Sequence, residues 1–461
     1  MNSLRPTVAL AAGAALALLT SFQLRPAPVA DDWQNLFDGK TLTGWKRLGG
    51  TAEYKVENGA IVGTSAAGSG NTFLVTDKEY GDFDLELDVK VDDSTSNSGV
   101  QTRSHFDAAA QPGKVYGRQV EIDPSARRWS GGIYDEARRQ WLYPLDLHPQ
   151  AKTAFKVGQY NHLQVECLGN EMKTWVNGVP VAYVVDPVDP TGFIGLQVHA
   201  VSDAAQAGHK VYFKNIRIQT THVRPSAFPA DIYVVNFVPN YLSAYEKQHG
   251  WRLLFDGKTS QGWRSAKGPA FPAQGWQIAD GLLSVLPSEG KEAANGGDIV
   301  TNAEYRAFDL SFEFKLTPGA NSGVKYFVTL AEKTDGSAIG LEYQVLDDAL
   351  HPDARLGRDG DRTLASLYDL KTADKPARFV HPIGEWNVGR VVAYPNNHVE
   401  HYLNGAKVLE YDRGSPAFRE LVAQSKYHVW PNFGEAPAGH LLLQDHGNRV
   451  SFRSIKIKEL K

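Results

Sequence analysis

Apolar and charged residues alternate strictly along the segment Phe83-Asp84-Leu85-Glu86-Leu87-Asp88-Val89-Lys90-Val91. The later segment Phe308–Leu316, with the sequence FDLSFEFKL, repeats the alternation. A period of two is typical of a β-strand with one buried face and one solvated face. Both segments therefore predict strands, and their likeness suggests that the chain contains a repeat.

Further motifs occur twice in the same order. They are Leu-Phe-Asp-Gly-Lys at 36–40 and 254–258, Asn-Ser-Gly-Val at 97–100 and 321–324, Asn-Gly at 177–178 and 404–405, and Gln-x-His at 197–199 and 444–446. The motifs at 36–40 and 254–258 show that each repeated unit is far longer than a solenoid repeat. The chain therefore contains two homologous domains. We expect a signal peptide at 1–30, a first domain at 31–220, a linker with a short helix at 221–250, and a second domain at 251–461.

The composition favours an all-β fold. The chain has 461 residues with 43 glycines, 24 prolines and 11% aromatic residues, and segments with helical periodicity are rare. Each Asn-Gly pair lies between short β-type runs, and this dipeptide is the strongest short-range hairpin signal. We predict two β-sandwich domains of the jelly-roll type in tandem.

The charge and the cysteine content exclude several classes of protein. The net charge is −4 and no long basic run occurs, so a nucleic-acid partner is not expected. Cys167 is the single cysteine, which excludes a disulfide framework and a cysteine-based metal site.

The N-terminus has the layout of a signal peptide. Arg5 precedes an apolar run at 8–19, which is shorter than the roughly 20 residues that a membrane span needs. We expect a periplasmic or extracellular protein with no stable membrane insertion after signal removal. The alternative is an uncleaved membrane anchor.

Polar residues share strand faces at corresponding places in both domains. Glu342 and Gln344 lie two apart in one copy, and Gln119 and Glu121 lie two apart in the other, with acid and amide exchanged. A second pair of segments contributes Gln197 and His199, and Gln444 and His446. Amides and acids bind hydroxyl groups, and a carboxylate or an imidazole can move protons, so these faces suit a saccharide. The alternative is that they are solvated strand faces without a role.

The ordered motifs resemble those of the 3-keto-disaccharide hydrolase domain family. The resemblance covers 33–219 and 251–460 and includes the closing motifs Phe213–Ile218 and Phe452–Ile457. It implies a concanavalin/laminarinase-like β-sandwich and an enzyme that cleaves the glycosidic bond of 3-keto-glycosides. Such cleavage would begin with removal of the C2 proton, continue by β-elimination of the C1 oxygen, and end with hydration of the enone.

The resemblance suggests roles for particular residues. In the second domain, Glu342 or His446 would be the base, Lys325 or a bound cation would stabilise the oxyanion, and Tyr368 would donate a proton. The analogous candidates in the first domain are Glu121, His199, Arg103 and Tyr134. We expect substrate binding by Gln344, Gln444, Asn321, Arg103, Gln119, Gln197 and Tyr134.

Alternatives remain for these residues and for the protein. Arg103 and Lys325 could pair with neighbouring acids, and Tyr134 and Tyr368 could be core aromatics. The second domain is the closer match to the active form, although Phe327 stands where the first domain has Arg103. A lectin-like protein without catalysis, or one binding and one catalytic domain, would fit the same motifs.

No cofactor is expected with certainty, but a divalent cation could bind. Asp347, Asp348, His351 and Asp353 form a run of oxygen and nitrogen ligands. The alternative is a solvated acidic loop. His398 and His401 lie three apart on a predicted strand, which places them on opposite faces. The repeated Trp45 and Trp263 are expected in the cores.

Overall fold

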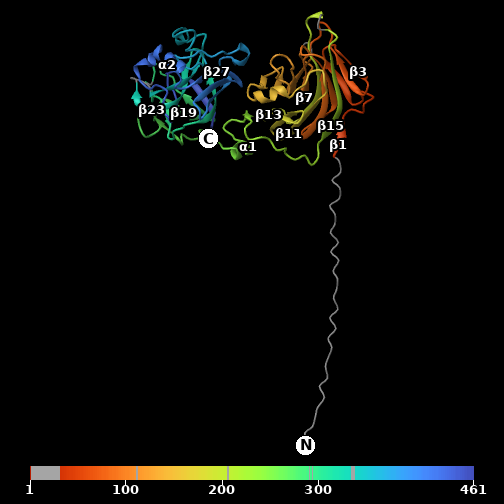
Figure 1. The fold of residues 1–461 in the computed structure, drawn as a ribbon, viewed down its shortest axis with the longest axis horizontal. Coiled ribbons are helices and arrows are strands. Elements are labelled where there is room, and N and C mark those ends of the chain that lie inside the picture. Colours follow the sequence, from red (N-terminus) through yellow and green to blue (C-terminus); the bar gives the residue numbers. More distant parts are fainter. Residues whose placement is uncertain (2–31, 111–112, 205–206, 290, 293, 334–337) are drawn as a thin grey trace.

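A computed structural model describes residues 1, 32–110, 113–204, 207–289, 291–292, 294–333 and 338–461. The described chain forms two β-sandwiches side by side, joined by the linker that contains the short helix α1 (Figure 1). The predicted tandem of β-sandwich domains is therefore confirmed. The predicted signal peptide at 1–30 lies outside the described residues apart from Met1. Within the described residues, no helix has the length and apolar character needed to cross a bilayer.

The first domain consists of a nine-stranded back sheet and a seven-stranded front sheet. The back sheet contains β1 (Trp33–Asn35), β3 (Glu53–Glu57), β4 (Ala60–Thr64), β6 (Phe83–Val91), β11 (Asn161–Leu168), β12 (Glu171–Val176), β13 (Val179–Val185), β15 (Lys210–Gln219) and β16 (Val235–Asn236). The front sheet contains β2 (Trp45–Gly49), β5 (Thr72–Tyr80), β7 (Ser98–Asp107), β8 (Lys114–Ile122), β9 (Ile133–Glu136), β10 (Gln140–Tyr143) and β14 (Gly192–Val198).

The second domain has an eight-stranded back sheet and a five-stranded front sheet. The back sheet contains β17 (Trp251–Leu253), β19 (Trp276–Ala279), β20 (Leu282–Val285), β22 (Phe308–Leu316), β25 (Trp386–Ala393), β26 (His398–Leu403), β27 (Ala406–Asp412) and β29 (Val450–Glu459). The front sheet contains β18 (Trp263–Ser265), β21 (Ile299–Thr301), β23 (Asn321–Lys333), β24 (Ala338–Leu346) and β28 (His440–Leu443). The helices are α1 (Ala244–Gln248) and α2 (Pro416–Ala423), with 3-10 turns at Pro149–Thr153, Pro352–Arg355, Ala377–Phe379 and Lys426–Val429.

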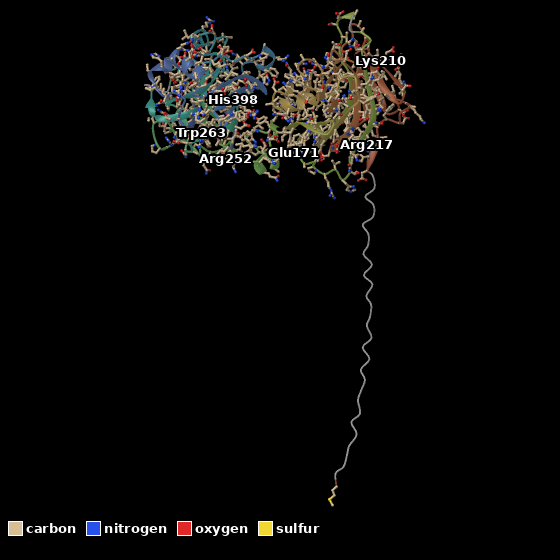
Figure 2. All side chains as sticks on the ribbon, viewed as in Figure 1. Glu171, Lys210, Arg217, Arg252, Trp263 and His398 are labelled. Carbon is tan, nitrogen blue, oxygen red and sulfur yellow. The ribbon has the colours of Figure 1, made fainter. Side chains whose placement is uncertain are left out.

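The predicted alternation holds in β6. Its apolar residues are fully buried between the two sheets, while Asp84, Glu86 and Asp88 are half-buried on the outer face. Trp45 and Trp263 are buried in the cores, as expected. Buried apolar side chains form the core of each domain, and Figure 2 shows side chains throughout both domains.

The expectation of one solvated face is wrong for β22. Asp309, Ser311 and Glu313 on its outer face are all buried. The linker covers this face, with the Tyr233 hydroxyl donating to Ser311 Oγ at 3.0 Å, and Arg390 binds the Asp309 carboxylate at 2.7 Å. Packing between the domains therefore overrides the pattern that the strand would show in an isolated sandwich.

The predicted hairpins and linker helix are both present. Asn177-Gly178 connects β12 to β13 and Asn404-Gly405 connects β26 to β27, and all four residues have positive φ. In the linker, Ser243 caps α1, and Glu246 of this helix binds Lys456 of β29 at 2.6 Å. The linker is thus bound to the back sheet of the second domain.

Candidate functional site

The register of the front sheets aligns the two candidate sites residue by residue. In the second domain Lys325 pairs with Glu342, and Gly323 pairs with Gln344. In the first domain Gln101 pairs with Gln119, and Gly99 pairs with Glu121. The counterparts of Lys325 and Glu342 are therefore the two amides Gln101 and Gln119. Glu121, the predicted acid of the first domain, stands at the position of Gln344.

These polar side chains lie on the face of the front sheet that points away from the back sheet. Their neighbours Val100, Val120 and Ile122 in the first domain, and Val324, Leu341 and Val345 in the second, belong to the hydrophobic cores. Because side chains alternate along a strand, the intervening polar residues point outwards. The predicted shared face of Glu342 and Gln344 is thus present.

The serine of the Asn-Ser-Gly-Val motif joins two strands of this face by a hydrogen bond. The hydroxyl of Ser322 donates to the Gln444 carbonyl oxygen at 2.8 Å, and that of Ser98 donates to the Gln197 carbonyl oxygen at 2.7 Å. Each serine thereby ties the strand of the motif to the strand that carries Gln-x-His. The motif's valine faces the core in both domains.

The glycine of the motif makes room for one polar side chain. A Cβ atom on Gly323 would overlap Glu342 Oε1, and a Cβ atom on Gly99 would overlap the side-chain amide of Gln119. Neither glycine has the positive φ that would require this residue type for backbone reasons. The requirement is therefore for space beside the polar group.

Glu342 is a buried carboxylate beside two cations. Its Oε2 lies 3.9 Å from Lys325 Nζ, and 4% of its side chain is exposed. Burial raises the pKa of Glu342 to about 7, although Lys325 and Lys426 act in the opposite direction. Burial also lowers the pKa of Lys426. A carboxyl group with this pKa can accept a proton near neutral pH.

Tyr368 lies next to Glu342 and is held by an acid. Its backbone N–H donates to the Glu342 carbonyl oxygen at 3.1 Å, and its hydroxyl donates to Asp353 Oδ2 at 2.9 Å. Lys426 Nζ lies 4.3 Å above the Tyr368 ring. Burial and the two nearby carboxylates raise the pKa of the Tyr368 hydroxyl above its ordinary value.

Gln444, His446 and Asn321 border the same face. Gln444 Nε2 donates to Glu292 Oε1 at 3.3 Å, and the His446 and His351 ring centres lie 5.4 Å apart. Among the described residues, His446 Nδ1 and Asn321 Oδ1 have no hydrogen-bond partner, and no described contact joins His446 to Glu342. Glu342 is therefore the better-placed of the two predicted bases.

The first domain holds its acid without a cation. Glu121 accepts hydrogen bonds from Asn97 Nδ2 at 2.8 Å and from Gln119 Nε2 at 3.0 Å, and Gln101 Nε2 donates to Gln119 Oε1 at 2.8 Å. Burial raises the pKa of Glu121 to about 7. The fully buried Gln197 has no side-chain hydrogen-bond partner among the described residues. This face is an array of amides around Glu121, with Glu136 of β9 on the same face.

Tyr134 and His199, two further predicted residues of the first domain, differ in their distance from the amide array. Tyr134 pairs with Gln119 across β8 and β9, and its ring centre lies 5.3 Å from that of Trp141. His199 is exposed just beyond the end of β14, and its Nδ1 lies 2.9 Å from the Ala200 carbonyl oxygen. The structure brings Tyr134 to the amide array but leaves His199 at its edge.

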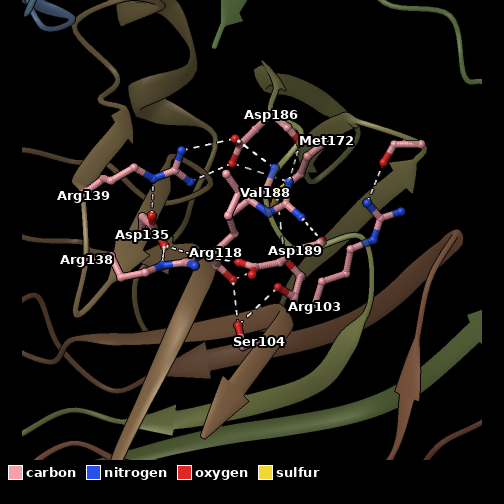
Figure 3. Close-up of polar contacts among 12 residues, drawn as sticks. Arg103, Ser104, Arg118, Asp135, Arg138, Arg139, Met172, Asp186, Val188 and Asp189 are labelled. Atoms are coloured by element: carbon pink, nitrogen blue, oxygen red, sulfur yellow. Dashed lines mark hydrogen bonds and ion pairs between the residues drawn. The ribbon is translucent and has the colours of Figure 1, made fainter. Parts of the chain in front are cut away.

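Arg103 lies away from Glu121. Its guanidinium donates to the carbonyl oxygens of Gly81 and Gly169 at 2.7 and 2.6 Å and binds Asp82 at 2.9 Å. Figure 3 shows it beside a buried network in which Arg118, Arg138 and Arg139 meet Asp135, Asp186 and Asp189. Arg103 therefore supports the fold, and Gln101 replaces it as the counterpart of Lys325.

A β-bulge explains the position of Arg103. The register of β7 against β8 shifts between Thr102 and His105, and Arg103 has a φ of 47°. Phe327 sits at the corresponding bulge of β23 with a φ of 53°. The difference between Arg103 and Phe327 thus concerns packing beside the core and not the polar face.

The sequence profile of the 3-keto-alpha-glucoside-1,2-lyase-like domain family matches residues 32–219 and 250–458. The chain belongs to this family. Among curated proteins, the 3-keto-disaccharide hydrolase of Bacteroides thetaiotaomicron is 37% identical over 233 residues, which cover 46% of this chain and 79% of the relative. The family that the motifs resemble is therefore confirmed, and it is present in both domains.

Solved structures of similar proteins include one from Parabacteroides distasonis, provisionally described as a glycosyl hydrolase. It is 32% identical, with a TM-score of 0.42, and the match covers 48% of this chain and all of that protein. A carbohydrate-binding module of family 66 from Bacillus subtilis is 22% identical, with a TM-score of 0.28, over 39% of this chain and 97% of the module.

The sequence patterns missed several polar residues near Glu342 in the second domain. Lys426 comes from the 3-10 turn after α2, and Arg362 and Asp369 come from the long connection after β24. Asp369 follows Tyr368 as Asp135 follows Tyr134, so the sequence held a signal for this residue. Lys426 and Arg362 lie in segments without strand periodicity, and their approach to Glu342 depends on tertiary folding.

The acidic run proposed for a cation does not converge. Asp347 and Asp348 accept hydrogen bonds from backbone N–H groups, and Asp353 binds Tyr368. Among the described residues, the ligand atoms of Asp347, Asp348, His351 and Asp353 form no group of three within 4.8 Å. The structure therefore favours local structural roles for this run.

One other group of potential ligands lies on the surface of the second domain. His398, Glu400 and Glu410 bring ligand atoms within 4.8 Å of one another, and His398 is labelled in Figure 2. Lys407 Nζ lies 3.2 Å from Glu400 and 2.5 Å from Glu410, so a lysine already pairs with both acids. His401 is buried on the opposite face of β26, as the spacing predicted.

Proposed function

We propose that this chain is a secreted or periplasmic hydrolase that cleaves the glycosidic bond of 3-keto-glycosides, and that its second domain is the catalytic one. Family membership and the relative named a 3-keto-disaccharide hydrolase support the substrate class. The predicted signal peptide supports the location. The observation that carries the proposal is the position of Glu342 between Lys325 and Lys426, with its pKa raised to about 7 by burial.

The first chemical step is proton transfer from carbon to Glu342. A ketone at C3 acidifies the hydrogen on C2, and the carboxylate of Glu342 takes this proton while the electron pair moves into the enolate. A general base works best when its pKa is near the working pH. A carboxylate at its ordinary pKa would be a weaker base for this transfer.

The two lysines stabilise the enolate. Negative charge moves from Glu342 to the substrate oxygen at C3 during this step, and Lys325 and Lys426 are already placed around the carboxylate. Fixed positive groups in a site with little water stabilise such charge strongly. The buried Lys325 and the more exposed Lys426 therefore serve the reaction without rearrangement.

The enolate then expels the C1 oxygen, which needs a proton. The pKa of Lys426 is lowered by burial and by the neighbouring Lys325 and Arg362. Its ammonium group is therefore a stronger acid than that of an ordinary lysine. The Tyr368 hydroxyl already directs its proton to Asp353, so Tyr368 orients the sugar and Lys426 acts as the acid. Addition of water across the resulting C1–C2 double bond completes net hydrolysis.

The first domain is assigned to binding. Gln101 and Gln119 replace the lysine and the glutamate of the catalytic pair, and the remaining acid, Glu121, has no cation at the position of Lys325. Amides donate and accept hydrogen bonds to hydroxyl groups but do not remove protons from carbon. The unpartnered side chain of Gln197 supports a ligand on this face.

Hydrogen exchange at C2 tests the proposed function. The purified protein is incubated with 3-keto-trehalose and with trehalose in D₂O, and the released sugars are analysed by NMR. We expect cleavage of the keto sugar alone, with deuterium at C2. Cleavage of trehalose, or cleavage of the keto sugar with the C2 hydrogen retained, would contradict the elimination route. Saturable binding without cleavage would instead support a lectin.

A further inference from the structure

A cavity of about 820 Å³ lies between the two domains, and interfaces between domains are a preferred place for ligand pockets. Its floor is the outer face of the back sheet of the second domain, and its other walls are the β9–β10 hairpin and the linker strand β16. It lies on the back-sheet side of the second domain, whereas Glu342 lies on the front sheet. The cavity is therefore separate from the proposed catalytic face.

The walls of the cavity are fixed by contacts between the domains. The Tyr143 hydroxyl donates to the Tyr233 carbonyl oxygen at 3.0 Å, and the ring of Phe379 from the second domain lies 5.9 Å from Trp129 of the first. Gly405 lies so close to the first domain that a Cβ atom there would approach Pro144 to 2.9 Å. The cavity is thus a feature of a packed interface.

Glu313 lines this cavity and has one buried carboxylate oxygen without a hydrogen-bond partner among the described residues. Its Oε2 accepts hydrogen bonds from Arg453 Nε and Nη2 at 2.8 and 2.7 Å, whereas its Oε1 has no hydrogen-bond partner among the described residues. Glu313 is 5% exposed and is therefore buried. A buried carboxylate oxygen without a partner costs free energy, and a ligand hydroxyl group would relieve that cost.

The lining is close to electrically neutral. Arg139, Arg390 and Lys456 all line the cavity, and each is bound to a carboxylate: Asp186 at 2.7 Å, Asp309 at 2.7 Å and Glu246 at 2.6 Å. The exposed Arg378 and Glu385 have no ion pair among the described residues and offset each other in charge. A ligand that needs many donors and acceptors but little net charge fits this lining.

A tryptophan from each domain also lines the cavity. Trp141 comes from β10 of the first domain and Trp386 from β25 of the second. Aromatic side chains combine an apolar face with low conformational freedom, which suits the C–H faces of sugar rings. We propose that this interdomain cavity binds a neutral oligosaccharide, with Glu313 Oε1 accepting from a hydroxyl group and Arg378 donating to another.

Calorimetric titration tests this second site on the mature full-length chain. The probes are maltotriose and cellotriose as neutral sugars and trigalacturonate as the anionic comparison. Val388→Phe would fill the cavity from an outward position of β25, Glu313→Gln would replace the free acceptor by a donor, and Arg378→Ala would remove the guanidinium. Arg224→Ala, at an exposed linker position, is the matched control.

We expect at least one neutral trisaccharide to bind, with Kd raised about tenfold or more by each cavity variant and unchanged in Arg224→Ala. Binding should persist in Glu342→Gln, which separates this site from the proposed catalytic face and makes the result independent of the proposed function. The proposal is overturned if neither neutral probe binds, if trigalacturonate binds more tightly than both, or if folded Val388→Phe and Glu313→Gln bind as well as the wild type.

Discussion

Gly323 provides the space that the carboxylate of Glu342 occupies, because a Cβ atom at Gly323 would overlap Glu342 Oε1. The two residues lie on neighbouring strands, with Gly323 on β23 and Glu342 on β24. In the first domain Gly99 makes the same space for Gln119. The repeated motif thus keeps the same geometry around an acid in one domain and around an amide in the other.

Gly323→Ala should displace the Glu342 carboxylate and lower kcat/KM by at least about a hundredfold, the range of a lost general base. Gly99→Ala is the matched control, because it introduces the same methyl group beside Gln119, and it should leave kcat/KM within about threefold of the wild type. Steady-state kinetics with a 3-keto-disaccharide measures both. Equal losses in the two variants would remove the assignment of catalysis to the second domain.

The pH dependence of kcat/KM should report the ionisation of Glu342. The base must be deprotonated, so the rate should rise with pH through an apparent pKa of about 7, and it should fall again at higher pH where Lys426 loses its proton. Lys325 lowers this pKa, so Lys325→Met should move the midpoint of the profile to higher pH. Lys407→Met, at the surface, should not move it. A midpoint that stays in place or falls in Lys325→Met would show that another group is the base.

Arg103→Met should affect stability and not catalysis. The substitution leaves two carbonyl oxygens and the Asp82 carboxylate without their donor, which should lower the free energy of unfolding by about 3 kcal/mol. Denaturant unfolding followed by fluorescence measures this loss, and kcat/KM below the transition should match that of the wild type. If Arg103→Met kept wild-type stability but bound substrate more weakly, the prediction would be wrong and Arg103 would belong to the substrate site.

Glu121 should make the protein less stable as pH rises. Its pKa is about 7 in the folded state and 4.5 as the ordinary value, so the folded state holds the proton more tightly. This contribution to stability is complete below pH 4.5 and is lost as pH rises through 7. As pH rises across that range, the free energy of unfolding should therefore fall by about 3 kcal/mol less in Glu121→Gln than in the wild type. Parallel curves for the two proteins in denaturant titrations would refute this environment for Glu121.

Much of the fold and part of the site follow from local patterns. The alternation along 83–91, the Asn-Gly turns and the duplicated motifs define two sandwiches, because strand faces and turn geometry depend on neighbouring residues. The same alternation correctly places Glu342 and Gln344 on one face. The family resemblance adds the substrate class, which no periodicity contains.

The remaining features depend on tertiary structure. Counting in twos from Gln101 would place Arg103 on the polar face, but the β-bulge at Arg103 reverses the direction of its side chain. Lys426 reaches Glu342 from a turn with no repeated motif. The buried outer face of β22 results from the packing of the linker, which no pattern within the strand reveals.

The most direct test of the account is the rate of C2 hydrogen exchange and cleavage of a 3-keto-disaccharide by Glu342→Gln and Glu121→Gln, measured side by side by NMR in D₂O. The account predicts that Glu342→Gln loses both exchange and cleavage by about a thousandfold, while Glu121→Gln keeps both near the wild-type rate. Full exchange and cleavage by folded Glu342→Gln would contradict it.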